Sequence, residues 1–113
     1  MVARNPLVAA PPFPVETALT VLGANIRTAR LRRRLSAEAI AQKIGVSRQT
    51  VAEAERGNPS TAIAVYVGLL WALGLAEQLA DVASPATDEE GLALAMQHEP
   101  KRARSREVLD NDF

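Results

Sequence analysis

Four consecutive polar residues near the middle of the chain have side chains that suit hydrogen bonding to the edges of nucleic-acid bases. They are Ser47, Arg48, Gln49 and Thr50, and they open a predicted helix. An arginine can donate two hydrogen bonds to O6 and N7 of guanine, and a glutamine can pair with N6 and N7 of adenine. Glu53, one turn further on, could accept from a cytosine amine or simply face solvent. We expect the four residues that open the helix, 47–50, to contact bases. For each charged side chain, the alternative is that it is only solvated at the surface.

The segment that must position these residues reads as two short helices joined by a tight turn. Ser36 and Ser47 each precede a helical pattern and are good N-caps. Gly45 lies in the turn, where glycine adopts a positive φ most easily. Ala41 and Ala54 are small where two steeply crossing helices would approach each other, as a helix-turn-helix requires. Any tight helical hairpin needs such residues, however. The apolar contacts are expected from Ile40, Ile44, Val46 and an inward-pointing Val51.

The basic side chains are concentrated on this motif, although the formal net charge of the chain is zero. Residues 24–56 carry eight basic side chains against three glutamates, a net charge of +5, whereas residues 57–100 carry six acidic side chains and no Lys or Arg. A polyanion would meet the basic segment rather than the average, which favours nucleic acid as a partner. The alternative is that the two halves neutralise one another. The predicted phosphate contacts are Arg33, Arg34, Lys43, Arg56 and the amides around Asn58.

The residue types that are missing exclude several function classes. The chain has no cysteine, so it has no disulfide, no Cys-ligated zinc and no thiol nucleophile, and its one histidine is His98. The six glycines form no phosphate-binding loop. We therefore expect no catalytic residues, no metal and no cofactor, and a binding protein rather than an enzyme. Abundant Ala and Leu with only 4% aromatic residues favour an all-α fold.

Helical periodicity and prolines divide the chain. Residues 1–14 are predicted to be a flexible, extended, proline-rich arm. Residues 15–82 are predicted to be the helical domain, with its fourth helix starting near Ser60 and a shorter helix over residues 76–82. An acidic helix is expected within residues 83–98, opened by a capping box from Thr87 to Glu90, and a flexible tail over residues 99–113. Prolines from Pro6 onward break any signal-peptide pattern, so we expect a cytoplasmic, nucleoid-associated protein.

Residues 62–76 form a run of fifteen residues without a charge. A membrane span needs about 20 such residues, and the flanks of this run are acidic. A helix that is apolar on all sides is more simply explained by its own domain on one face and a second subunit on the other. The predicted homodimer interface consists of Ile63, Tyr66, Val67, Leu70 and Trp71.

Residues 27–73 resemble the phage-repressor (XRE, Cro/C1) type of helix-turn-helix domain. The resemblance rests on Ile26-Arg27, Arg30, Leu35-Ser36, Glu38, Ile40-Ala41, residues 44–47, Thr50-Val51, residues 55–57, Pro59 and Leu73-Gly74. It implies an all-α, five-helix, lambda-repressor-like domain, here with an extra C-terminal helix, and a structural ion pair between Arg30 and Glu55. The family often has glutamine at position 37 and glycine at position 34, where this chain has Ala37 and Arg34.

Residues 84–94 and 100–104 resemble the C-terminal part of DNA-binding antitoxins of the HipB type. That resemblance implies a homodimer that binds a palindromic operator in double-stranded DNA, represses its own operon and binds a HipA-like Ser/Thr kinase toxin. Leu92, Leu94 and Met96 would contact that partner. The alternatives are a stand-alone XRE-family repressor without a toxin, or a protein-binding adaptor that uses the same fold.

Overall fold

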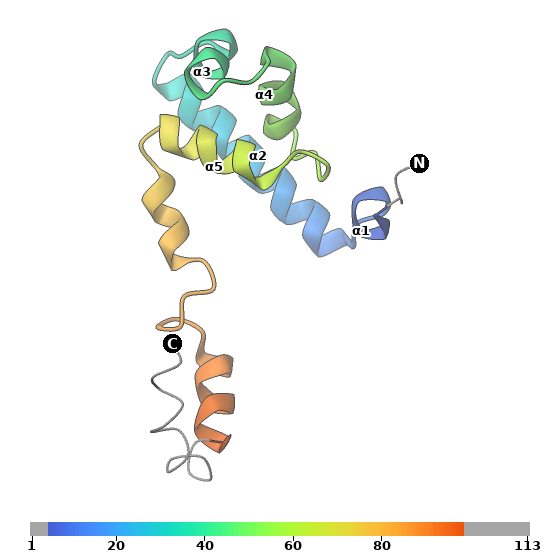
Figure 1. The fold of residues 1–113 in the computed structure, drawn as a ribbon, viewed down its shortest axis with the longest axis vertical. Helices are drawn as coiled ribbons and strands as arrows, with labels where there is room; N and C mark the ends of the chain where they lie inside the picture. Colours follow the sequence, from blue (N-terminus) through green and yellow to red (C-terminus); the bar gives the residue numbers. More distant parts are fainter. Residues whose placement is uncertain (1–4, 99–113) are drawn as a thin grey trace. The chain divides into compact units, whose positions relative to one another are not determined.

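A computed structural model of the chain describes residues 5–98, and these residues are helical without any strand (Figure 1). The described residues fall into two compact units, which are divided between Glu77 and Gln78. The elements in chain order are α1 (Pro6–Ala9), α2 (Phe13–Arg32), α3 (Ala37–Ile44), α4 (Arg48–Glu55), α5 (Ile63–Ala72) and the 3-10 helix η1 (Ala76–Asp81), followed by helical residues 89–98. The all-α fold class expected from the sequence is confirmed.

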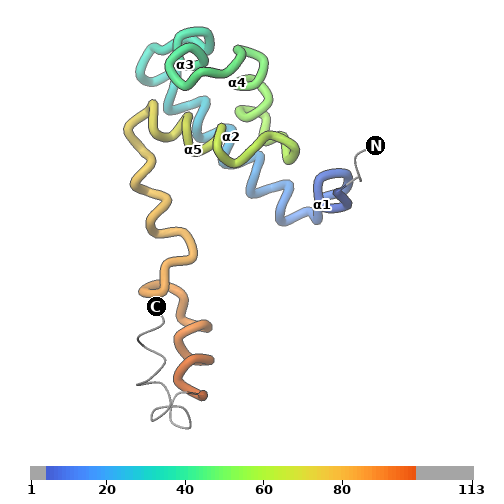
Figure 2. Tube along the Cα trace, viewed as in Figure 1, coloured from blue at the N-terminus to red at the C-terminus, as the bar shows by residue number. Residues whose placement is uncertain are grey.

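The long helix α2 is the support on which the first unit is built. Its buried residues Gly23, Ile26 and Arg30 recur at three- and four-residue spacing and so form one stripe along the helix. Both α4 and α5 pack against α2, and α3 packs against α4 and α5. Figures 1 and 2 show α3 and α4 next to each other near the C-terminal end of α2, with α5 running across it.

Both short helices of the predicted motif are capped by the serines that precede them. The Ser36 hydroxyl accepts a hydrogen bond from the Ala39 amide at 3.0 Å, and the Ser47 hydroxyl accepts one from the Thr50 amide at 3.0 Å. Gly45 ends α3 with a φ of 80°, and its amide donates to the Ala41 carbonyl at 2.9 Å. Local hydrogen bonding therefore fixes where α3 ends and α4 begins.

The core of this unit lies between α2 and the three shorter helices. Tyr66 is the largest fully buried side chain, and its hydroxyl donates to the Asn58 carbonyl at 2.8 Å. This bond satisfies the one polar atom that the tyrosine carries into the core. Ala41 and Ala54 are buried where the helices cross, as expected from their size. The remaining buried apolar residues are Ile26, Ile40, Val51, Leu69, Leu70 and Leu73.

The expectation of an extended arm over residues 1–14 is wrong where the structure describes it. Residues 6–9 form the helix α1, which Asn5 caps by accepting a hydrogen bond from the Leu7 amide at 2.9 Å, and α2 begins at Phe13. Pro6 and Pro14 both lie in the first turn of a helix, where the N–H that proline lacks would have had no intrahelical partner. Proline therefore starts these helices instead of preventing them.

Two other predicted helix starts differ from the structure. The fourth helix begins at Ile63 and not near Ser60, because both the amide and the hydroxyl of Ser60 donate to the Asn58 side chain in a turn. The acidic helix is capped by Asp88, whose carboxylate accepts from the Gly91 amide at 3.0 Å. Thr87, the predicted cap, instead donates its hydroxyl to the Ser84 carbonyl at 3.3 Å.

In the second unit, apolar side chains remain largely exposed over the described residues. Leu92, Leu94 and Met96 are 57%, 49% and 58% exposed. Ala83 precedes this helix with a φ of 56°, which is unusual for a residue other than glycine. The predicted flexible tail, residues 99–113, lies outside the described residues.

The backbones of α2 and α4 approach each other closely at Gly23. A Cβ atom at this position would lie 2.5 Å from the Ala54 carbonyl oxygen and 2.7 Å from that of Glu55. Both are backbone atoms, so no flexible side chain can move aside. Only glycine lets the two helices approach to this distance.

We expect Gly23→Ala to lower the free energy of unfolding by about 2 to 3 kcal/mol, because the added methyl group forces α2 and α4 apart. The matched control is Gly68→Ala in α5, whose Cβ would lie 3.7 Å from Ile44 Cδ1, an ordinary contact. That change should raise the free energy of unfolding by about 0.5 to 1 kcal/mol, because alanine favours the helix. Urea unfolding followed by circular dichroism measures both, and equal effects would contradict the close approach.

Candidate nucleic-acid interface

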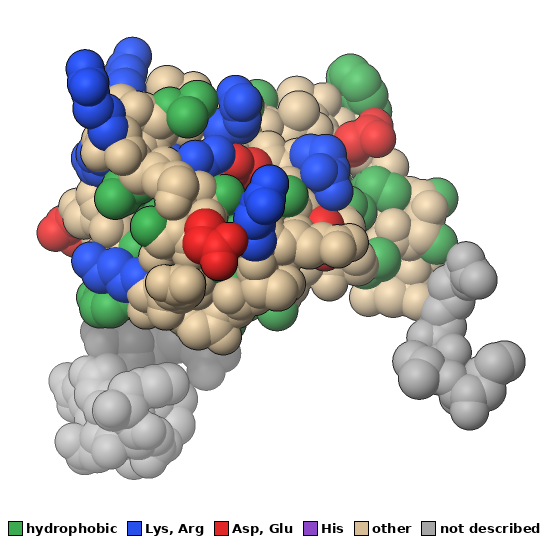
Figure 3. Space-filling model, turned by 90° about the horizontal axis from the view of Figure 1, so that it is seen from above, with side chains coloured by type: hydrophobic (Ala, Val, Ile, Leu, Met, Phe, Trp, Pro, Cys, Tyr) green, Lys and Arg blue, Asp and Glu red, His purple; other side chains and the backbone are tan. Residues whose placement is uncertain are grey.

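One face of α4 is exposed and polar while the opposite face is in the core. Val51 and Ala54 have no exposed surface, whereas Arg48 and Gln49 are exposed. Arg48, Gln49, Ala52 and Arg56 together line a shallow hollow of about 490 Å³. Figure 3 looks down on the end of the molecule that carries α3 and α4 and shows Lys and Arg side chains spread over it, with carboxylates between them. The exposed side of α4 can therefore meet a broad, negatively charged surface.

Within the predicted base-reading set, Ser47 and Thr50 are bonded to each other. Besides capping α4, the Ser47 hydroxyl lies 2.9 Å from the Thr50 hydroxyl. Gln49 has a different local partner, since its Nε2 donates to a Glu53 carboxylate oxygen at 3.4 Å. Glu53 thus contacts Gln49 along the helix surface, one turn apart. Arg48 and Gln49 remain the two long, exposed side chains at the start of α4.

An ion pair holds α4 against α2. Arg30 Nε lies 2.7 Å from Glu55 Oε2 and Arg30 Nη2 lies 3.0 Å from Glu55 Oε1, so the pair is bidentate. The side chains are only 10% and 6% exposed. The hydrogen bond to Glu55 raises the pKa of Arg30 above its ordinary value, against the opposing effect of burial. Arg30 Nη1 also donates to the Leu35 carbonyl at 2.9 Å, so a single guanidinium joins α2, α4 and the residue before the α3 cap.

The predicted phosphate contacts do not form one cluster. Arg56 lines the hollow of Arg48 and Gln49, whereas the Lys43 ammonium lies over the Trp71 ring, 5.6 Å from its centroid. Arg34 has a φ of 56° in the turn after α2. The Asn58 side-chain oxygen accepts from Ser60 in the turn before α5. Arg33 folds back on its own helix, and its Nη1 donates to the Ala29 carbonyl at 2.9 Å.

Two of the five residues of the predicted dimer interface lie in the core of the chain itself. Tyr66 is 2% and Leu70 is 7% exposed, because they share the inner face of α5 with Leu69 and Leu73. The other three follow one another at four-residue steps on the outer face. Ile63, Val67 and Trp71 are 71%, 36% and 59% exposed.

Sequence reasoning missed two structural contributions to this surface. The close approach at Gly23 sets the position of α4 but appears in the sequence only as a glycine inside a helical pattern, which usually signals a weak point. The Leu35 carbonyl receives a hydrogen bond from Arg30, and no side-chain pattern predicts a backbone acceptor.

Two capped short helices joined by a tight glycine turn, with the second exposing its N-terminal residues, define a helix-turn-helix protein of the DNA-binding class. Residues 21–83 match a family model described as a helix-turn-helix domain, and the chain belongs to that family. Comparison with curated proteins and with solved structures gives no match. No helix within residues 5–98 is long and apolar enough to cross a membrane.

We expect Glu55→Gln to lower the free energy of unfolding by about 2 to 3 kcal/mol, because it leaves the buried Arg30 guanidinium without a counter-charge. The matched control is Glu38→Gln, at an exposed position in the first turn of α3, where the loss should be much smaller. Chemical unfolding of both variants makes the comparison. Equal losses would show that the Arg30–Glu55 pair does not hold α4 in place.

Proposed function

We propose that the protein is a sequence-specific DNA-binding transcriptional regulator in which Arg48 and Gln49 read bases in the major groove. The observation that carries this proposal is the two-sidedness of α4. Its inner face is fixed by Val51, Ala54 and the Glu55 ion pair, and its first turn presents two long donors to solvent. A helix held rigidly from behind can place its N-terminal residues in the major groove, against the edges of the bases.

The remaining candidate DNA contacts have supporting roles in this proposal. Ser47 caps α4 and its hydroxyl is hydrogen-bonded to that of Thr50, and both residues are proposed to contact DNA from that fixed position. Contacts to phosphates position the protein without discriminating between sequences. The proposed phosphate contacts are Arg34, Lys43, Arg56 and the amides around Asn58. Arg33, also predicted as a phosphate contact, lines a separate hollow on α2.

We also propose a two-fold homodimer that binds a palindromic operator. The support is the row of exposed apolar side chains on α5, Ile63, Val67 and Trp71, within the uncharged run of residues 62–76. The same row of a second copy would pack against this row. That contact would bury both rows and bring the two recognition helices together. In such dimers the helices lie about 34 Å apart, one turn of DNA.

The finer proposal is an autorepressing antitoxin of the HipB type that binds a HipA-like kinase through its C-terminal unit. The exposed Leu92, Leu94 and Met96 favour it, since an acidic helix gains nothing from approaching phosphates. The alternatives are a repressor without a toxin and a protein-binding adaptor. A chain ending at Val82 separates them: lost kinase binding with retained DNA binding supports the antitoxin, and unchanged kinase binding contradicts it.

The base-reading proposal predicts that Arg48→Ala and Gln49→Ala each lower the preference for the operator over random DNA by about 5- to 150-fold, the range expected for one bidentate base contact. Selection from a random duplex pool identifies the preferred site, and titrations at several salt concentrations give the ratio. Lys43→Ala is the control, because losing a phosphate contact should weaken both DNAs equally and reduce the salt slope by about one. If neither α4 variant changes the ratio, the assignment of the recognition residues is wrong.

The dimer proposal predicts that the full chain sediments as a dimer at micromolar concentration and that Val67→Glu makes it a monomer, because a buried carboxylate would lack a partner. Val21→Glu is the matched control, since Val21 is a similarly exposed valine on α2, 51% exposed. It should leave the dimer intact. A wild-type chain that sediments only as a monomer would refute the interface.

A further inference from the structure

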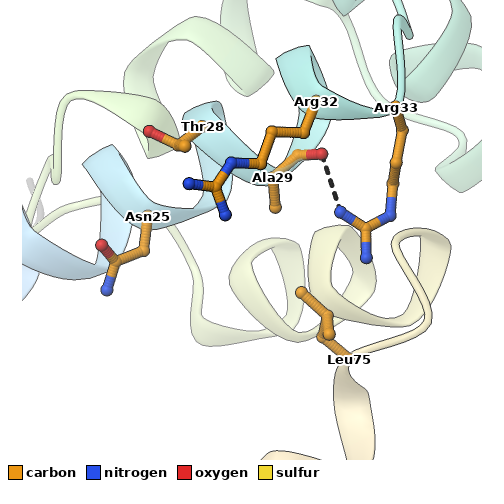
Figure 4. Close-up of a pocket in the computed structure, with 6 residues that line it drawn as sticks. All are labelled: Asn25, Thr28, Ala29, Arg32, Arg33 and Leu75. Carbon is orange, nitrogen blue, oxygen red and sulfur yellow. Dashed lines mark hydrogen bonds between the residues drawn. The ribbon is translucent and has the colours of Figure 1, made fainter.

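A second polar hollow lies on α2, away from the candidate interface. Its volume is about 380 Å³, and it is lined by Asn25, Thr28, Ala29, Arg32, Arg33 and Leu75. Figure 4 shows the Arg32 and Arg33 side chains extending on either side of Ala29, Arg32 back along the helix and Arg33 towards Leu75. The hollow therefore has two guanidinium groups, an amide and a hydroxyl on α2, and an apolar side chain from the segment that follows α5.

The charged side chains that line this hollow are both arginines. Residues 17–37 carry five arginines and no carboxylate, and none of the lining residues is acidic. Among residues 5–98 the ion pair within 4 Å is the one between Arg30 and Glu55, so neither Arg32 nor Arg33 has a carboxylate partner in that part of the chain. Two guanidinium groups that line one hollow without a carboxylate partner attract a multiply charged anion.

Helical geometry directs the hollow away from α4. Successive residues of a helix are about 100° apart, so Arg32 lies about 200° around α2 from Arg30, and Asn25 and Thr28 lie on the same far side. The Arg30 guanidinium points to Glu55 on α4. Arg32 therefore projects from the opposite side of α2, and the base-reading surface does not account for it.

The C-terminal end of a helix repels anions through its unpaired carbonyls, but here three of those carbonyls accept hydrogen bonds. The Arg33 side chain donates to the Ala29 carbonyl, the amides of Arg33 and Leu35 donate to the Arg30 carbonyl, and the Arg34 amide donates to the Leu31 carbonyl. The partial negative charge at the C-terminal end of α2 is thus reduced beside the hollow. The arginine side chains are therefore the main charges there.

We propose that this hollow binds a small organic phosphate, such as a nucleotide, with its phosphate groups at Arg32 and Arg33. The planar guanidinium groups match phosphate oxygens, Asn25 and Thr28 supply an amide and a hydroxyl for the polar parts of the ligand, and Ala29 and Leu75 give its organic part an apolar wall. A phosphate can come from a free metabolite or from a DNA backbone, and the proposal commits to the free molecule. The site is additional to the proposed DNA contacts and does not depend on them.

The first experiment titrates the full, isotope-labelled chain with ATP and with inorganic pyrophosphate, without DNA or Mg²⁺, and follows backbone amide and arginine Nε–H resonances by NMR. We expect saturable shifts in residues 25–33 and at Leu75 with both probes, and none with adenosine, which lacks phosphate. Shifts that are absent, or that spread equally over all the arginines, would overturn the proposal.

Two single-charge variants on the same helix separate a site from general attraction. Arg32→Gln should weaken ATP binding at least about tenfold, whereas Arg27→Gln removes the same charge from an exposed position outside the hollow and should weaken it less than about twofold. Gln and Arg have similar helix propensities, so both variants should keep the circular dichroism of the wild type. Equal losses would mean that ATP responds only to net charge, which refutes the site.

A third titration, with a 20-base-pair duplex of arbitrary sequence at low salt, distinguishes the two sources of phosphate. Arg32→Gln and Arg27→Gln should bind this duplex equally within about twofold. A selective loss of duplex binding in Arg32→Gln, together with no ATP shifts in the wild type, would assign the hollow to the DNA backbone and overturn the small-ligand proposal. Because ATP binding is measured without DNA, failure of the DNA-binding proposal leaves this test intact.

Discussion

The arginine–carboxylate pair between α2 and α4 is the interaction on which the orientation of the recognition helix depends. Arg30 and Glu55 are both nearly buried, and the two hydrogen bonds between them fix rotation as well as distance. The remaining Arg30 donor reaches the Leu35 carbonyl, so the same group also sets where the chain enters α3. Gly23 complements this pair, since its missing side chain lets α4 come close enough for the bonds to form. Charge pairing and backbone approach thus specify one geometry together.

Local signals made the helix-turn-helix itself predictable from the sequence. Ser36, Ser47 and Gly45 act through hydrogen bonds and backbone angles within a few residues, so sequence position alone determines their effect. Tyr66 and Leu70 could not be separated from Ile63, Val67 and Trp71, because an uncharged helix has no polar face to mark its outside. The start of α2 differs from the prediction for another reason. Proline breaks a helix interior but suits a first turn, and amino-acid composition does not indicate which of these two positions a proline takes.

The arginines of α2 are divided by helical rotation into groups with different surroundings. Arg30 faces inward and is neutralised by Glu55, whereas Arg32 and Arg33 line a hollow without acidic residues. A single basic segment of the sequence therefore contributes both a buried structural charge and charges that are exposed without a carboxylate partner among the described residues. The location of a basic segment in the sequence therefore indicates the class of partner. It does not indicate which arginine would contact that partner. Which arginines of α2 are exposed depends on which face of this helix the other helices cover.

The left-handed backbone at Arg34 has a consequence for how this chain balances folding against activity. A residue with a side chain in this conformation costs about 1 to 2 kcal/mol relative to a relaxed one, and glycine would avoid that cost. The chain instead carries a permanent positive charge at the turn that leads into α3. Small domains have only a narrow margin of stability, so the strain at this turn takes up an appreciable part of that margin. Arg34 is thus a position at which this chain gives up thermostability that glycine would supply.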